Sequence, residues 1–103
     1  MIVTHIKTKT HTHYCGRASS YTGIGLDCSI LGNPYLMRDQ SGTERDRVIA
    51  QYRVQLNRWR IQDSEEWKTL ISLPHNAVLG CFCHPKACHC DVLAAAFNWH
   101  HTN

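Results

Sequence analysis

The chain has 103 residues, of which 43% are hydrophobic and 18% charged, and its formal net charge is +3. This length suits one compact domain over residues 1–103, and the composition excludes a disordered chain. No apolar run reaches the roughly 20 residues of a membrane-spanning helix, and no secretory signal is visible at the N-terminus. We therefore expect a cytoplasmic protein without a membrane partner, in which the six cysteines stay reduced.

Residues 2–14 alternate between two kinds of side chain, as a half-buried strand does. Isoleucine and threonine fill most even positions, and histidine or lysine fills the odd positions from 5 to 13. One strand of that length is unusual, so we expect a break near Thr8. His11 and His13 then share a face. We expect that face to be polar and solvated rather than metal-binding.

A long loop and a helix are predicted next. Residues 15–35 are rich in glycine and serine and close on Gly-Asn-Pro-Tyr, which indicates a loop. Ser41 and Glu44 then have the spacing of a helix capping box, with Thr43 as a competing cap. Apolar side chains recur at helical spacing from there to Trp59, so this segment is predicted to be a helix.

The C-terminal half predicts a short helix, a strand and a last helix. Ser64 is expected to cap the short helix, which ends before Pro74. The apolar run at 77–82 indicates a buried strand, and 91–101 indicates a helix. We expect the three tryptophans to lie in the core and the last two histidines to fray. These residues are Trp59, Trp67, Trp99, His100 and His101. The predicted fold is a single α/β domain, a small sheet flanked by about three helices.

Between the last predicted strand and the last predicted helix lies the sequence CFCHPKACHC, residues 81–90. Loops that follow strands are the usual ligand sites of α/β folds. Thiolates and imidazoles are the ligands that zinc prefers, and the same thiols are also suited to an iron–sulfur cluster. Most structural zinc sites use two separated ligand pairs, so remote side chains are candidates to complete this one. Those candidates are Cys15, Cys28, His11 and His13.

Two other interpretations of this segment stay open. Cys88 stands where the last helix begins, and free N–H groups and the helix dipole stabilise a thiolate there. Cys88 is therefore a candidate nucleophile. Alternatively, the segment is a turn of small, reduced, buried cysteines with exposed histidines. We favour a metal site because of the number of ligands that the segment supplies.

Several motifs resemble those of one family. They are YCGR at 14–17, LGNPY at 31–35, a helix with Arg45 and Tyr52, and LGCFCHPKACHCDVL at 79–93. The chain resembles a family of short bacterial and phage proteins catalogued as a domain of unknown function, number 4326. That family closes on Leu-Gly-Cys-x-Cys-x-Pro-x-x-Cys-His-x-Asp-Val-Leu. The resemblance spans nearly the whole chain, and the closing motif is the specific part of it.

The resemblance implies a core set of metal ligands but no activity. The implied set is Cys81, Cys83, Cys88 and His89. Cys15 stands where the family usually has isoleucine, and Cys90 stands where it usually has glycine. Both departures weaken the case that these two cysteines are required ligands. The sequence leaves open which side chain completes the site. The open candidates are Cys15, Cys28, His84 and Cys90.

Four further polar side chains are candidates for binding or catalysis. Arg17 and Arg45 suit recognition of a phosphate or a carboxylate. Asn33 suits a base or a sugar, but we expect it to hold a turn. Asp91 is expected to cap the last helix, and its other candidate roles are partner of His89 and general base.

The sequence therefore predicts a small, zinc-preferring metal-binding protein that binds a nucleotide or a nucleic acid. Arg17 and Arg45 are expected to meet phosphate, and the mildly positive charge fits such a partner. A second hypothesis is a small enzyme that acts on a nucleotide-like substrate through Cys88 or a metal-bound water. A third is a phage protein that binds and modulates a host protein, with structural cysteines.

Overall fold

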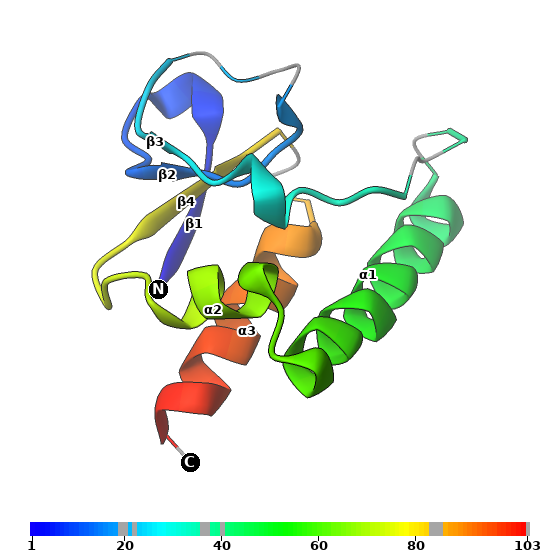
Figure 1. The fold of residues 1–103 in the computed structure, drawn as a ribbon. Helices are drawn as coiled ribbons and strands as arrows, with labels where there is room; N and C mark the ends of the chain where they lie inside the picture. Colours follow the sequence, from blue (N-terminus) through cyan, green and yellow to red (C-terminus); the bar gives the residue numbers. More distant parts are fainter. Residues whose placement is uncertain (19–20, 22, 36–37, 40, 83–85, 103) are drawn as a thin grey trace.

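The fold is a four-stranded parallel sheet with three helices, as Figure 1 shows for this computed structural model. The structure describes residues 1–18, 21, 23–35, 38–39, 41–82 and 86–102. The strands are β1 (Ile2–His5), β2 (His13–Tyr14), β3 (Leu26–Asp27) and β4 (Val78–Cys81). The helices are α1 (Gly42–Gln62), α2 (Glu65–Ile71) and α3 (His89–Thr102). The predicted α/β class is confirmed.

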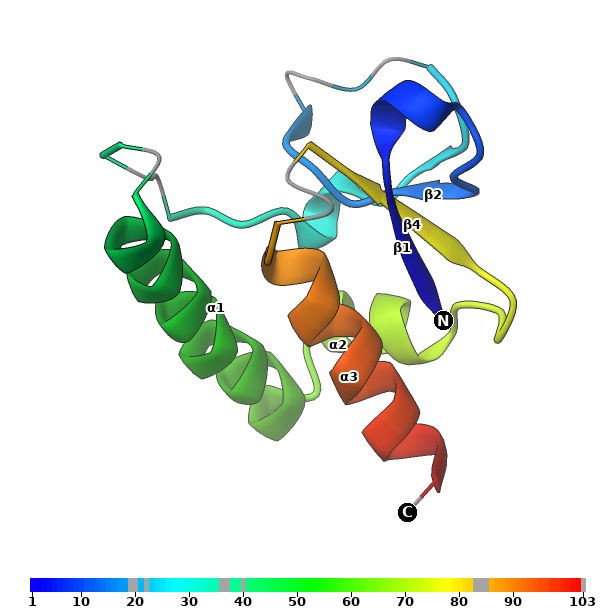
Figure 2. The ribbon, with the colours of Figure 1, turned by 180° about the vertical axis from the view of Figure 1, so that it is seen from behind.

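The strand order is β1-β4-β2-β3, so the last strand enters the middle of the sheet. β4 pairs with β1 from Ile2↔Val78 to His5↔Cys81, and on its other side with β2. α2 and α3 lie next to the strands, whereas α1 lies beside these two helices on the side farther from the sheet (Figures 1 and 2). This arrangement places the start of α3 near the end of β4.

The N-terminal segment breaks where the sequence predicts. β1 ends at His5, and a short 3-10 turn, η1 (Ile6–Thr8), follows it. Lys9 closes this turn in the left-handed conformation, with φ of 54°, and its N–H donates to the Ile6 carbonyl. The chain then re-enters the sheet as β2, so one long alternating pattern becomes two strands.

The expectation of a plain loop over residues 15–35 is wrong in part. This segment contains β3 and a second 3-10 turn, η3 (Ser29–Leu31). β3 forms because the Leu26 and Cys28 amides donate to carbonyls of the β2 segment, at 2.9 and 2.7 Å. Both residues of β3 are exposed, so hydrophobic patterning carried no sign of the strand.

The predicted helices and their caps are present. Ser41 accepts a hydrogen bond from the Glu44 amide at 3.1 Å, and Ser64 accepts one from the Trp67 amide at 3.3 Å. The other half of the capping box is absent at Ser41, because Asp39 accepts the Ser41 N–H instead. β4 and α3 also match the sequence, although α3 begins two residues earlier than expected, at His89.

His11 and His13 are buried, with 4% and 6% of their surfaces exposed, so the expected solvated face is wrong. The His11 ring lies against Gly80 of β4, and its Nε2–H donates to the Ile24 carbonyl at 3.2 Å. The His13 Nδ1 is 2.7 Å from the Thr12 hydroxyl. Neighbouring strands and the 15–35 segment cover both rings, which an isolated strand pattern does not reveal.

Two expectations for the aromatic side chains also fail. Trp99 is 51% exposed, whereas Trp67 is buried and Trp59 packs against the core. His101 does not fray, because its Nε2–H donates to the Ile71 carbonyl at 3.1 Å and its ring packs on Phe97. His100 also lies within α3. Tertiary contacts with α2 therefore hold the last turn of α3 in place.

The buried core joins the sheet to all three helices. Its largest fully buried side chains are Tyr14, Tyr52, Phe97, Leu31, Leu70, Leu79 and Leu93. Several cysteines belong to the same buried cluster. Within the described residues, no helix has the length and apolar character needed to cross a membrane.

We expect Glu44 to make stability depend on acidic pH. Its carboxylate accepts hydrogen bonds from the Arg47 side chain and from the Arg38 amide. These bonds lower the pKa of Glu44 from 4.5 to about 2, with Arg47 as the main cause. A depressed pKa in the folded state stabilises the protein above pH 4.5, and that contribution is lost as the pH falls towards 2.

Thermal unfolding of Glu44→Gln and the wild type between pH 7 and pH 2 tests this expectation. The variant should be less stable at pH 7, and the difference should close as the pH approaches 2. Glu65→Gln makes the same chemical change at an exposed first-turn residue of α2 and controls for the lost charge. A Glu44→Gln difference that is independent of pH would contradict the ion-pair explanation.

Candidate metal centre

Five cysteines from separate parts of the chain converge at the carboxyl edge of the sheet. Cys15 directly follows β2, Cys28 directly follows β3, and Cys81 is the last residue of β4. Parallel strands end at one edge, so these three positions are brought close together. Cys88 and Cys90 come from the beginning of α3, which starts beside that edge (Figure 1). All five are buried and free of disulfides.

Three of these thiols form a compact group. The Sγ atoms of Cys81, Cys88 and Cys90 all lie within 4.8 Å of one another, and those of Cys81 and Cys88 are 3.1 Å apart. Tetrahedral zinc with Zn–S bonds of about 2.3 Å separates its sulfurs by about 3.8 Å. A small movement of these side chains would therefore allow the three sulfurs to act as three ligands of one zinc ion. The predicted ligand Cys83, with His84, lies outside the described residues.

Cys15 and Cys28 extend the network of sulfur atoms beyond this group. The Cys15 thiol hydrogen-bonds to Cys28 and to Cys90. Those two bonds, with Cys28 as the larger cause, lower the pKa of Cys15 to about 4. The same interactions raise the pKa of Cys28 and of Cys90, because each donates its proton towards Cys15. These interactions favour the thiolate form of Cys15, which lies next to the compact group.

His89 lies beside the group but faces the backbone. Its Nε2–H donates to the Cys15 carbonyl at 2.6 Å, and the same nitrogen is 3.7 Å from the Cys90 Sγ. The ring also meets Tyr52 edge to face, at 5.1 Å between centroids. The structure therefore places His89, a predicted ligand, beside the three thiols. Its Nε2–H is, however, already hydrogen-bonded to a backbone carbonyl.

The environment of Cys88 does not favour an activated nucleophile. Its side chain is buried, and its sulfur hydrogen-bonds to Cys81. That bond raises the pKa of the Cys88 thiol to about 12, which outweighs the expected help from the helix dipole. Asp91 caps α3 as expected, because its Oδ2 accepts the Cys88 backbone N–H at 3.0 Å. Its carboxylate is therefore engaged at the helix start.

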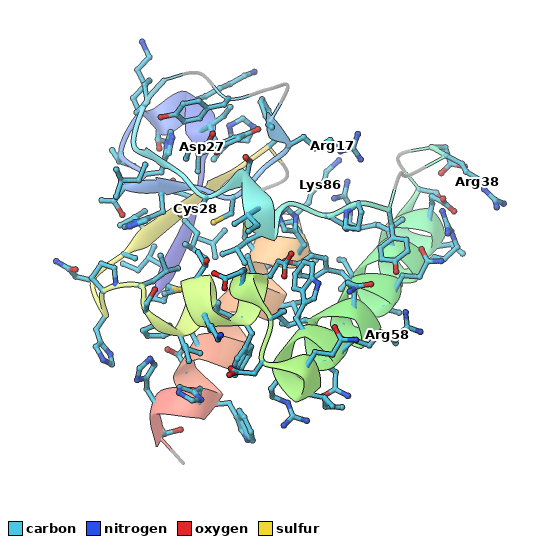
Figure 3. All side chains as sticks on the ribbon, viewed as in Figure 1. Arg17, Asp27, Cys28, Arg38, Arg58 and Lys86 are labelled. Atoms are coloured by element: carbon cyan, nitrogen blue, oxygen red, sulfur yellow. The ribbon has the colours of Figure 1, made fainter. Side chains whose placement is uncertain are left out.

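The predicted ligand-binding residues have three different environments. Arg45 is buried, and its guanidinium donates to the Ala87 carbonyl at 3.1 Å, so it braces the chain just before Cys88. Asn33 holds a turn as expected, because its Oδ1 accepts the Tyr35 amide at 2.9 Å. Arg17 is exposed at the carboxyl edge of the sheet (Figure 3).

Sequence reasoning undervalued Cys90 and missed Tyr52 as a neighbour of the centre. The resemblance makes Cys90 only an open candidate, because the family usually has glycine there, yet its sulfur belongs to the compact group. Its position in the first turn of α3, two residues after Cys88, was the available signal. Tyr52 is fully buried against His89, and its hydroxyl donates to the Leu31 carbonyl at 2.6 Å. Helical spacing predicted its burial but not its neighbours.

These features define a small α/β domain with a buried cysteine centre between its last strand and last helix. The chain belongs to the family described as Domain of unknown function (DUF4326), whose model matches residues 3–99. This match confirms the family that the sequence motifs indicate. No curated protein and no solved structure matches the chain.

Proposed function

We propose that this protein binds one structural zinc ion at the carboxyl edge of its sheet. The observation that carries the proposal is the compact group of three buried thiols, Cys81, Cys88 and Cys90, whose sulfurs lie within 4.8 Å of one another. Cys83, which stands in the family motif, is the proposed fourth ligand. The thiols are soft ligands, which favours zinc over calcium or magnesium.

A single ion accounts for this group better than an iron–sulfur cluster does. In an iron–sulfur cluster at most two of the thiolates bind the same iron atom, so three thiols this close to one another fit one ion better. The 3.1 Å between the Cys81 and Cys88 sulfurs fits shared coordination of one ion more closely. An ion held there would link the end of β4 to the start of α3. In a chain of 103 residues, such a link adds appreciably to stability.

The second half of the proposal is that the metal-stabilised domain binds a nucleotide or a nucleic acid. Its net charge of +3 favours an anionic partner. Arg17 and Lys86 are exposed after the carboxyl ends of β2 and β4, which is the usual ligand edge of such sheets (Figure 3). Arg45 has a supporting role in this proposal, because its guanidinium holds the backbone before Cys88.

Elemental analysis of the full chain, purified with a reductant and without chelators, tests the zinc proposal. We expect about one zinc per chain, no stoichiometric iron, and zinc loss on treatment with a chelator. A second sample, refolded with excess zinc after chelation, should recover the same stoichiometry. A protein that contains no zinc and does not take it up on refolding would overturn the proposal, and stoichiometric iron would favour the cluster instead.

A further inference from the structure

A groove with ligand-like dimensions lies between α1 and α3, away from the thiols. It encloses about 300 Å³, which is at the lower end of the range for small-molecule sites. Leu56 and Trp67 line it on one side, and Val92, Ala96 and Trp99 line it from α3. The small side chains of Val92 and Ala96 keep this stretch of α3 from filling the space against α1.

The polar side chains of the groove are cationic or neutral. Arg53, Asn57 and Arg60 project into it from one face of α1, at spacings of four and three residues. Arg60 donates to the Asn57 Oδ1 at 2.8 Å, and its guanidinium lies 5.6 Å from the centre of the Trp99 ring. No carboxylate lines this groove in the described part of the chain. An anionic ligand therefore suits it.

The aromatic side chains of the groove favour a ligand that contains a flat ring in addition to its anionic group. Trp99 is 51% exposed although it lines the groove, so part of its indole faces the solvent there. The guanidinium of Arg60 lies 5.6 Å from the centre of that ring, which is within the range of a cation–π contact. An aromatic ring joined to an anionic group matches both features, and a nucleotide is the common biological form of that combination.

A smaller hollow connects the groove to the cysteine centre. It encloses about 180 Å³ and shares Arg53 and Val92 with the groove, and it reaches Cys88. Its other polar side chains are Asp46 and Asp91, whose carboxylates repel phosphate. The phosphate of a bound nucleotide is therefore best placed on the groove side of Arg53, away from these carboxylates, with the base towards the tryptophans.

We propose that the groove between α1 and α3 binds a nucleoside monophosphate. In this complex Trp99 stacks on the base and Arg53 pairs with the phosphate. A volume of about 300 Å³ has room for one nucleotide. This inference rests on the nucleotide half of the proposed function, but it places the nucleotide in the groove between α1 and α3 and not at the Arg17 and Lys86 edge. It does not depend on the zinc proposal, because none of the groove's lining residues is a proposed ligand.

Calorimetric titration of the full chain with AMP, GMP, CMP and UMP tests the inference. We expect at least one of them to bind with a Kd below about 1 mM, the range of a weak small-ligand site. Trp99→Ala should weaken binding of that nucleotide and of its nucleoside by at least tenfold. Arg53→Gln should weaken binding of the nucleotide by at least tenfold but leave the nucleoside unaffected, because only the nucleotide has a phosphate.

Arg58→Gln is the matched control for Arg53→Gln. Arg58 is exposed on α1, does not line the groove, and points away from α3 (Figure 3). The Arg58→Gln variant should bind the nucleotide as tightly as the wild type does. If the wild type binds a nucleotide and both groove variants bind it equally well, the groove is the wrong site, although the proposed function survives. If the wild type binds none of the four, this inference and the mononucleotide form of the proposal both fail.

Discussion

Replacing Cys88 with serine is expected to abolish stoichiometric zinc binding and to lower the melting temperature by about 10 to 20 °C in excess zinc. Cys88 supplies one of three buried sulfurs within 4.8 Å of one another, and a serine hydroxyl is a poor zinc ligand. A metal present at 100 times its Kd stabilises a folded protein by about 2.7 kcal/mol. In a domain of this size, that energy corresponds to the expected shift.

The measurement is thermal unfolding with and without a chelator, together with zinc content. The chelator should lower the melting temperature of the wild type by a similar amount and hardly change that of Cys88→Ser. Cys28→Ser makes the same chemical change at another buried cysteine of this edge, outside the compact group. It should keep its zinc. A Cys88→Ser protein that retains one zinc per chain would show that Cys88 is not a ligand.

Replacing Gly80 with alanine is expected to destabilise the protein by about 1 to 3 kcal/mol. A Cβ at position 80 would lie 2.5 Å from Cγ of His11 and 2.9 Å from its Cβ. These atoms are at the base of a buried ring, so they cannot move aside as the end of a flexible side chain would. The strand that ends at Cys81 would have to shift, and the cysteine centre would shift with it.

Denaturant unfolding of Gly80→Ala measures this cost, and Gly42→Ala is its control. Gly42 is the exposed first residue of α1, and a Cβ there meets nothing within 4 Å. That variant should be as stable as the wild type, or up to about 1 kcal/mol more stable. Adding His11→Ala to Gly80→Ala should cost less than the sum of the two single changes. Strict additivity would show that the His11 ring is not the obstacle.

The sequence motif predicts where Gly80 lies but not why a glycine is needed there. The Leu-Gly-Cys sequence placed this glycine in a buried strand and identified the family. The sequence does not explain why position 80 requires glycine, because His11 is distant in the chain and its side chain is predicted to be solvated. The buried ring of His11 occupies the space that a side chain at position 80 would need.

The sequence by itself determined the elements that local physics controls. Neighbouring residues determine these elements. They are the serine caps of α1 and α2, the break after β1, the buried strand β4 and the helix that follows the cysteine segment. The clustering of Cys81 with Cys88 was also foreseeable, because the ends of one short strand-to-helix connection lie near each other. These features arise from spacing, capping and hydrophobic period within a few turns of chain.

Only the tertiary structure decided which distant groups share the centre. β4 enters the middle of the sheet, between β1 and β2, and so brings Cys81 to the edge where Cys15 follows β2 and Cys28 follows β3. Cys90 joins the compact group because α3 starts at that edge, and Trp99 remains exposed beside the groove between α1 and α3. Strand order and helix packing are set by contacts between residues far apart in the chain, and local sequence patterns do not encode these contacts.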